Sequence, residues 1–196
     1  MEEFTLPENI EFNEGDEEHA GEVVISPFER GYGHTIANAY RRVLLSSLPG
    51  AAVESLQIEG VQHEFTTVDG VKEDVIEIIL NLKELAVKVH SEDSISLELK
   101  ADEKGNVTAQ AFEENADVEI VNDDLKLFTV VDEDVEVNME VTFGPGRGYI
   151  KSDEKNTEDW PVGTIAIDSR YSPIYNVGYD VEKMRIEETS DYDKAI

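Results

Sequence analysis

Cysteine is absent from the 196-residue sequence, so neither disulfides nor thiolate metal sites can form. No stretch approaches the run of about 20 apolar residues that a membrane-spanning helix needs. The first twelve residues, MEEFTLPENIEF, are acidic and lack the basic and apolar regions of a secretory signal. We therefore expect a cytoplasmic protein that does not associate with membranes.

Basic residues are scarce, with 16 lysines and arginines against 45 acidic residues and a formal net charge of −29. Nucleic acid backbones repel such a polyanion unless its basic groups are clustered, because lysine and arginine supply most non-specific affinity for phosphate. Direct DNA binding is therefore not expected. The acid excess fits a strongly solvated surface, such as one adapted to high salt. The alternative is an acidic mimic of DNA that occupies a basic cleft.

The usual catalytic and metal-binding motifs are also missing. The four histidines are scattered, and no pair has the i, i+4 spacing of a helical zinc motif. His63 and Glu64 come nearest to an acid/base pair, but adjacent residues on a strand point to opposite faces. The GPGRG segment at 144–148 lacks the lysine and hydroxyl residues of a P-loop, and no serine lies in a G-x-S-x-G context. We expect no catalytic residues, metal or cofactor, which leaves a metal-dependent hydrolase as a weak alternative.

One window departs from the acidic composition. The 24 residues from Arg30 to Val53 contain no aspartate or glutamate, yet they hold Arg30, Arg41 and Arg42, half of the six arginines. Interface cores are enriched in arginine and depleted in acidic residues. The window is therefore the first candidate for a partner-binding surface.

A helix over residues 35–48 is predicted inside this window, with Thr35 as its N-cap and Pro49 and Gly50 after its end. Apolar residues recur at helical spacing and predict the face that packs inward; they are Ile36, Ala39, Tyr40, Val43, Leu44 and Leu48. The opposite face carries Asn38, Arg41, Arg42 and Leu45. A leucine flanked by arginines favours a protein-binding face over a merely solvated one, although the pattern alone leaves both open.

The rest of the chain is predicted to be mostly β. A short strand is expected over 21–28, and AVESLQIEGV, SISLELK and VEVNMEVTF all alternate in strand fashion. A second helix is indicated by the helical spacing of Val71, Val75, Ile78, Ile79 and Leu82. Two more β-like runs lie around 163–168 and 175–187, and the polar segment 152–159, SDEKNTED, is predicted to be an exposed loop.

Four blocks of sequence resemble bacterial RNA polymerase alpha subunits, in the order expected for that family. Residues 29–53, ERGYGHTIANAYRRVLLSSLPGAAV, are similar to the family signature ERGxGHTLGNALRRxLLSSxPGxAV. The other blocks are residues 58–85, the GRGYI segment at 146–150, and residues 165–194. Ala37 stands where the family usually has glycine, and Tyr40 where it has leucine. Both changes are tolerable in a helix.

The resemblance implies an α+β fold with two subdomains. A discontinuous dimerisation subdomain would comprise residues 1–50 and 174–196, and a mostly β subdomain, residues 51–173, would be inserted between them. Family members continue past the position of Ile196 into a long helix, a linker and a DNA-binding domain. From the resemblance we therefore expect upstream DNA recognition to be absent from this chain and dimerisation to be weakened.

The resemblance also implies a non-catalytic scaffold that forms a homodimer and docks the beta and beta-prime subunits of RNA polymerase. Carried over by position, Arg42 is the arginine needed for beta binding, supported by His34, Asn38, Arg41, Leu45 and Ser46. Lys83 and Ile167 match family positions implicated in docking the large subunits. The helix identified in this way is also the one that the acid-free window indicates. The alternative left open is an acidic DNA mimic or another protein-interaction module.

Overall fold

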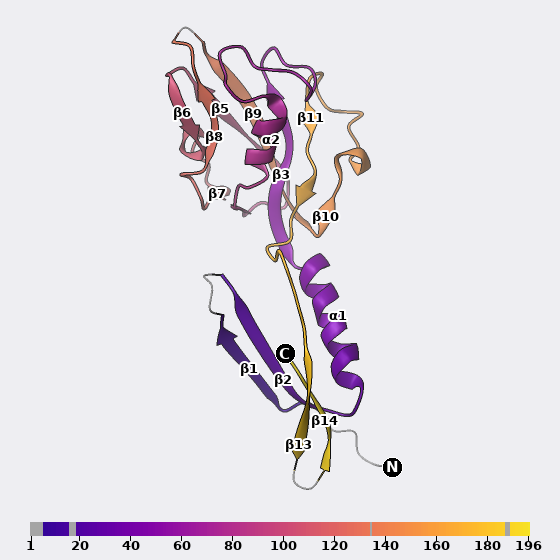
Figure 1. Cartoon of the computed structure of the whole chain (residues 1–196). Helices are drawn as coiled ribbons and strands as arrows, with labels where there is room; N and C mark the ends of the chain where they lie inside the picture. The colour runs from indigo at the N-terminus through magenta and orange to yellow at the C-terminus, as the bar shows by residue number, and fades with distance from the viewer. Residues whose placement is uncertain (1–5, 16–18, 134, 187–188) are drawn as a thin grey trace. The chain divides into compact units, whose positions relative to one another are not determined.

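The computed structural model describes residues 6–15, 19–133, 135–186 and 189–196. The chain divides into two compact units, one formed by residues 1–47 with 174–196 and the other by residues 48–173 (Figure 1). The parts of the predicted dimerisation subdomain at 1–5, 16–18 and 187–188 lie outside the described residues. No described helix is both long and apolar enough to cross a bilayer.

The first unit contains a four-stranded antiparallel sheet built from both ends of the chain. Its strands follow the spatial order β1, β2, β14, β13. They are β1 (Asn9–Glu14), β2 (Gly21–Phe28), β13 (Val181–Ile186) and β14 (Thr189–Ala195). Strand β14 pairs with both β2 and β13, so the sheet joins segments that are more than 150 residues apart in sequence.

Helix α1 (Tyr32–Ser46) packs on this sheet through small residues. Gly33 and Ala37 are buried, and Ala37 lies in a core with Phe28 and Ala195. A Cβ added at Gly33 would lie 2.8 Å from both the Cβ of Asp193 and a methyl carbon of Val181, so only glycine permits this approach. The resulting core is small, and several large apolar residues of the unit remain exposed.

The helix begins three residues before the predicted start, and the prediction of Thr35 as the N-cap is wrong. The residue at the N-cap position is Gly31, whose φ of 87° lies in the left-handed region that glycine adopts at low cost. The backbone N–H of Gly31 donates to Oδ2 of Asp193 at 2.7 Å. A carboxylate from the end of the chain thus satisfies a helix N-terminus near its beginning.

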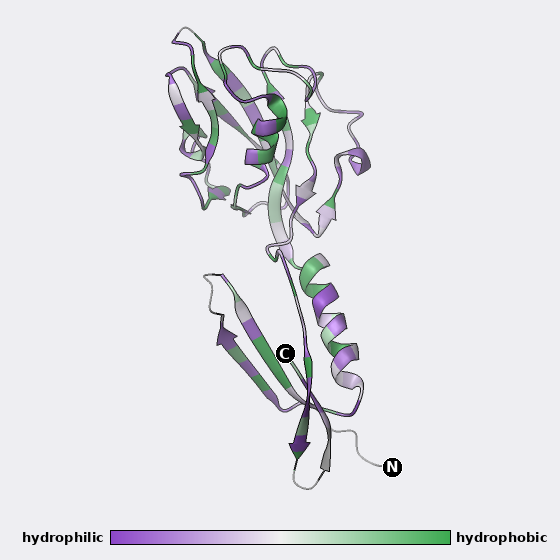
Figure 2. Ribbon diagram, in the orientation of Figure 1, coloured by the Kyte–Doolittle hydropathy of each residue, from purple (hydrophilic) through white to green (hydrophobic). Residues whose placement is uncertain are grey.

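The predicted inward face of this helix is also partly wrong. Tyr40 is 53% exposed and Val43 50% exposed, and Ala39 is exposed too, whereas Ile36 and Leu44 are half-buried. The sheet contacts the helix along Gly33 and Ala37, because small side chains let the backbones approach. In Figure 2, hydrophobic and hydrophilic residues are both spread along the length of α1.

The second unit is mostly β, as predicted for the insert. Its main sheet has four antiparallel strands in the order β11, β3, β9, β5, which are Ile165–Ala166, Pro49–Ile58, Val137–Arg147 and Ile95–Ala101. Three two-stranded sheets complete it: β4 (Val87–Val89) with β7 (Val118–Ile120), β6 (Gly105–Thr108) with β8 (Lys126–Val130), and β10 (Tyr149–Ile150) with β12 (Ser169–Arg170). Short 3-10 helices occur at Ala109–Ala111 (η1) and Ser152–Glu154 (η2).

The core of this unit lies on one face of the main sheet. Alternate residues of β9 are buried, as predicted, and they are Val137, Met139, Val141 and Phe143. Leu56, Ile58 and Leu99 from the neighbouring strands join them. Burying such side chains contributes about 1.5–3 kcal/mol each, so this core is the main source of the unit's stability.

Helix α2 (Val75–Leu82) covers this core with Val75, Ile78 and Leu82, all of which are fully buried. The helix begins at Val75, after the predicted Val71, because the Asp74 side chain caps it by accepting from the N–H of Glu77 at 2.7 Å. With only two α-helices in the described part of the chain, the predicted α+β class is confirmed only in part, whereas the mostly β insert is confirmed.

Candidate partner-binding surfaces

Helix α1 carries most of the residues that sequence analysis selected. Asn38, Arg42 and Ser46 are exposed, as are His34 and Arg41, while Leu45 is half-buried. The helix has no aspartate or glutamate along its length, although the chain carries 45 acidic residues. An exposed helix with two adjacent arginines is thus present where the sequence predicted a partner-binding surface.

The segment that leads into β13 lies along one flank of this helix. Arg41 Nε donates to the carbonyl oxygen of Val177 at 3.0 Å. The ring of His34 meets the ring of Tyr179 edge-on, with centroids 6.3 Å apart. His34 and Arg41 therefore make contacts inside their own unit, which leaves them less free to engage another protein than the sequence suggested.

Arg42 has a different environment from its neighbour. Successive residues project about 100° apart around a helix, so Arg42 points away from the flank that holds Arg41. Its guanidinium has no hydrogen-bond or ion-pair partner within the described part of the chain. Its carbonyl oxygen accepts from the hydroxyl of Ser46 at 2.7 Å. Arg42 thus presents unused donors to solvent or to a partner.

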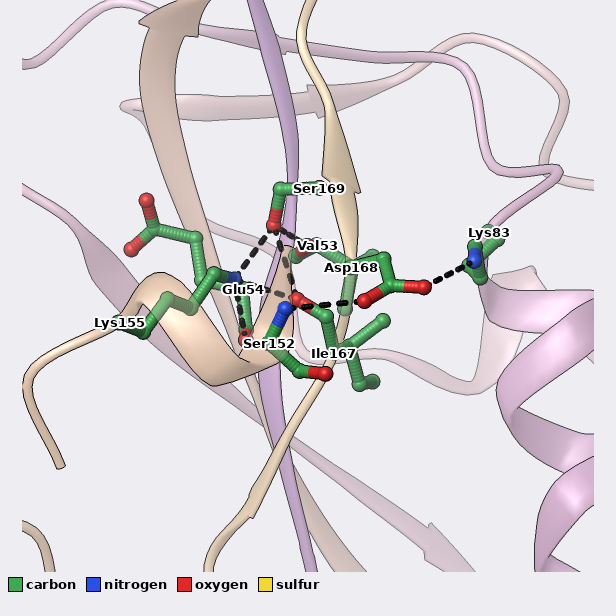
Figure 3. Close-up of polar contacts among 8 residues, drawn as sticks. All are labelled: Val53, Glu54, Lys83, Ser152, Lys155, Ile167, Asp168 and Ser169. Carbon is green, nitrogen blue, oxygen red and sulfur yellow. Dashed lines mark hydrogen bonds and ion pairs between the residues drawn. The ribbon is translucent and has the colours of Figure 1, made fainter. Parts of the chain in front are cut away.

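A second group of polar contacts lies in the other unit, around the predicted residue Lys83 (Figure 3). Lys83 Nζ lies 3.3 Å from Oδ2 of Asp168. The other oxygen of that carboxylate accepts from the N–H of Ser152 at 2.9 Å. The Ser152 backbone bond, assisted by hydroxyl donors of Ser152 and Tyr149 and by Lys83, lowers the pKa of Asp168 to about 2 against the opposing effect of burial. Asp168 is therefore ionised at every physiological pH.

Lys155 is half-buried, and it contacts the chain segment that carries Asp168 on the side away from Lys83 (Figure 3). Its ammonium donates to the carbonyl oxygens of Glu54 at 2.8 Å and of Ile167, and to the hydroxyl of Ser169 at 2.6 Å (Figure 3). The Ser169 hydroxyl in turn donates to the carbonyl oxygen of Val53. Burial lowers the pKa of Lys155, although the charges of Glu54 and Asp168 oppose that effect.

Ile167 is only 1% exposed and belongs to the core of its unit. The structure thus brings the predicted residues Lys83 and Ile167 close in space through Asp168, which follows Ile167 in sequence and pairs with Lys83. Sequence reasoning missed Asp168, Ser152 and Lys155. The lysine within the acidic SDEKNTED segment was the available signal, and the prediction that this whole segment is an exposed loop is wrong at Lys155.

Among the described residues, no three histidine or acidic side chains are grouped closely enough to hold a metal ion. His63, the nearest candidate for acid/base chemistry, is exposed. The two polar surfaces above carry donors and acceptors that can make protein–protein contacts.

Comparison with known proteins places the chain in a family. Residues 56–172 match the family model described as the RNA polymerase Rpb3/RpoA insert domain. The chain is 49% identical over 174 residues to the DNA-directed RNA polymerase subunit alpha of Moorella thermoacetica, covering 89% of this chain and 55% of that protein. The subunit of the same name from Staphylococcus aureus is 46% identical over 187 residues, covering 95% of this chain and 59% of that protein.

The mostly β unit is thus an insert domain of the RNA polymerase type. The chain belongs to the family of bacterial RNA polymerase alpha subunits, as the sequence blocks predicted. It spans between 55% and 59% of the length of these curated relatives.

Proposed function

We propose that this chain is a non-catalytic assembly scaffold of a bacterial RNA polymerase, which dimerises and docks the beta and beta-prime subunits for DNA-templated transcription in the cytoplasm. The observation that carries the proposal is the environment of Arg42: an exposed guanidinium with no partner among the residues that the structure describes, on a helix that lacks acidic residues. Arginine, with tryptophan and tyrosine, is enriched at the energetic hot spots of protein interfaces.

Self-association is the second part of the proposal and is assigned to a discontinuous subdomain of residues 1–50 and 174–196. Among its described residues, the first unit buries few in its own core. Its exposed apolar side chains include Phe12, Tyr32, Tyr40 and Val43, of which Phe12 is 79% exposed. Exposed apolar surface beside a small core favours burial against another protein, and a second copy is the partner that the family resemblance implies.

Docking of the large subunits is assigned to both polar surfaces. On α1 the proposed contacts are His34, Asn38, Arg41, Arg42, Leu45 and Ser46, with Arg42 as the principal residue. In the second unit Lys83 is the proposed contact, and Ile167 acts from the core by fixing the backbone that carries Asp168. The relatives are subunits of DNA-directed RNA polymerases, which supports assembly of this chain into such an enzyme.

Co-purification with a tagged beta subunit tests the central assignment. Truncating an arginine at an interface hot spot costs about 2 kcal/mol or more, so Arg42→Ala should weaken binding by a factor of about 30. Lys104→Ala is the matched control, because Lys104 is also an exposed cation but lies in the other unit. Equal retention of beta by the Arg42→Ala variant and the wild type would show that the assigned surface is wrong.

An acidic DNA mimic is the alternative function, and the open face of the main sheet in the second unit favours it. Glu98 and Glu140 lie directly opposite each other on β5 and β9, and Glu59 lies nearby. Lys100, however, forms an ion pair with Glu98 at 3.0 Å, so this face is partly neutralised. A mimic should displace DNA from a basic protein at low ionic strength, and the displacement should weaken steeply as salt is added. Absence of competition at low salt would exclude this alternative.

A further inference from the structure

The contacts around Asp168 point to a role for a residue that lies behind the proposed docking site. We propose that Lys155 is a positioning residue for the Lys83–Asp168 pair: it fixes the chain on both sides of Asp168, so that the carboxylate holds Lys83 in place for a large subunit. The inference rests on the proposed function, because it assumes that Lys83 contacts a large subunit.

The first step is the geometry of the turn that contains Lys155. The ammonium binds the carbonyl oxygen of Ile167 and the hydroxyl of Ser169, the residues immediately before and after Asp168. Three residues earlier in the same turn, the N–H of Ser152 binds the Asp168 carboxylate. One turn therefore holds both the backbone beside Asp168 and one of its carboxylate oxygens, and the other oxygen accepts from Lys83 (Figure 3).

The second step is the identity of the acceptors. Within the described part of the chain, Lys155 donates three hydrogen bonds, all to neutral oxygens, which belong to Glu54 on β3, Ile167 and Ser169. Placing an ammonium group half-buried without a directly bonded carboxylate costs free energy of folding, because burial disfavours its charge. Well-packed apolar side chains stabilise an interior at least as well as buried charges do. The ammonium instead fixes the positions of chain segments relative to one another. It lies at the end of a long side chain and has three N–H donors, with which it joins its own turn to β3 and to the residues on either side of Asp168.

The third step is the exposure of the pair that is positioned. The side chains of Lys83 and Asp168 are 31% and 34% exposed, so a partner can reach them. Asp168 is the one acceptor that the structure gives the Lys83 ammonium within the described residues, which leaves two N–H donors unused. The partner group should accordingly be a hydrogen-bond acceptor, such as a carboxylate or a backbone carbonyl of the large subunit.

Binding of the full chain to a purified large subunit tests the proposal with five variants besides Arg42→Ala: Lys155→Met, Lys83→Met, the double variant of these two, Lys155→Arg, and Lys155→Met combined with Arg42→Ala. Methionine keeps the apolar stem of lysine and removes the donors, whereas arginine keeps a charge and donors. Lys72→Met is the control, because Lys72 is exposed in the same unit. Circular dichroism confirms that each variant is folded before its dissociation constant is measured.

If Lys155 acts through Lys83, Lys155→Met and Lys83→Met should each weaken binding by about ten-fold, and the double variant should be no weaker than Lys83→Met alone. Combining Lys155→Met with Arg42→Ala should instead multiply the two effects, because Arg42 belongs to the other unit. Lys155→Arg should restore part of the affinity. Binding by Lys155→Met that equals the wild type, or a double variant with multiplied losses, would overturn the proposal.

The pKa of the Asp168 carboxyl group, followed by NMR in the chain alone, separates this inference from the proposed function. Lys155→Met should raise it from about 2 towards the ordinary value, because the turn no longer holds Ser152 against the carboxylate and a nearby positive charge is lost, whereas Lys155→Arg, which keeps the charge, isolates the contribution of the turn. An unchanged pKa would refute the positioning role even if Lys83 binds a partner. A raised pKa of Asp168 in Lys155→Met would support the contacts described for Lys155. If Lys83→Met nevertheless bound the large subunit normally, Lys83 would not be a docking residue, and the positioning role proposed for Lys155 would be refuted.

Discussion

Arg41 is bound to its own chain through the carbonyl oxygen of Val177, 136 positions further along the sequence. Arg42, the next residue, offers its guanidinium to no group within the described residues. Two identical side chains that are adjacent in sequence therefore have different surroundings, and the difference follows from the angle at which successive residues leave a helix.

This difference predicts that the two arginines respond differently to truncation. Arg41→Ala should speed amide hydrogen exchange in residues 177–180, because this segment loses a hydrogen bond from a charged donor. A well-formed hydrogen bond of this kind contributes about 1.5–3 kcal/mol, and it contributes less at an exposed position such as this one. Arg42→Ala should leave that exchange unchanged. Mass spectrometry of peptides covering the segment measures both. Equal exchange in the two variants would contradict the distinction.

Gly33→Ala should destabilise the first unit. The new methyl group would lie 2.8 Å from carbon atoms of Asp193 and Val181, and the Asp193 Cβ is held by its backbone in β14. Overpacking of this kind costs about 1–3 kcal/mol, which outweighs the gain of up to about 1 kcal/mol expected from replacing glycine in a helix. Denaturant unfolding measures the change. The control is Gly178→Ala, since a Cβ at that position meets no atom within 4 Å.

Asp193 should make the first unit sensitive to acid. Its side chain is 2% exposed. Burial alone would raise the pKa of Asp193, but the bonds from Lys183 and from the backbone N–H groups of Gly31 and Gly33 outweigh burial and lower it. Because the folded pKa lies below the unfolded one, the stabilisation is complete above the unfolded pKa of about 4 and is lost as pH falls through the folded value.

Asp193→Asn should therefore lower the free energy of unfolding by about 1–3 kcal/mol at neutral pH, and the difference from wild type should shrink below pH 4. Urea titrations at a series of pH values measure it. A constant difference across that range would show that the charge of Asp193 is not responsible.

Val43→Ser should weaken the proposed self-association without unfolding the unit. Val43 is 50% exposed on α1, and serine and valine have similar helix propensities, so the monomer should lose little stability. If Val43 is buried between two copies, its truncation should raise the dissociation constant by roughly ten-fold. Sedimentation across a range of concentrations measures it. Val162→Ser is the control, because Val162 is 94% exposed in the other unit and should have no effect.

The sequence predicted where helices and strands occur more reliably than it predicted which face of each element is buried. Periodicity identified both helices and the strands β3, β5 and β9, because alternation and helical spacing reflect which side chains of an element a single neighbour can cover, but it predicted no strand at β14. It failed at Tyr40 and Val43, where apolar residues have helical spacing but remain exposed in the single chain. The contact with the sheet is made by Gly33 and Ala37, and a hydrophobicity pattern gives such small residues little weight.

The sequence predicted those residues of the candidate site that residue type or family position indicates. It could not predict those residues whose role depends on contacts between positions far apart in the sequence. The acid-free window led to Arg42, and the family resemblance led to Lys83. Neither could reveal that Asp193 supplies the acceptor for the amide of Gly31, the N-cap of α1, or that Lys155 binds the chain on both sides of Asp168. Both contacts join residues whose distance in space is set by the completed sheet, and a local window of sequence contains no information about it.

The position of β14 between β2 and β13 determines when each unit can fold during synthesis. Residues 48–173 are continuous, so that unit can form as soon as it has left the ribosome. The sheet of the other unit waits for its last strand, which ends at Ala195. Until then β2 has an unpaired edge and α1 has no acceptor from Asp193. The nascent chain therefore carries a finished insert while the N-terminal part of the remaining unit is still accessible to chaperones or to premature strand pairing.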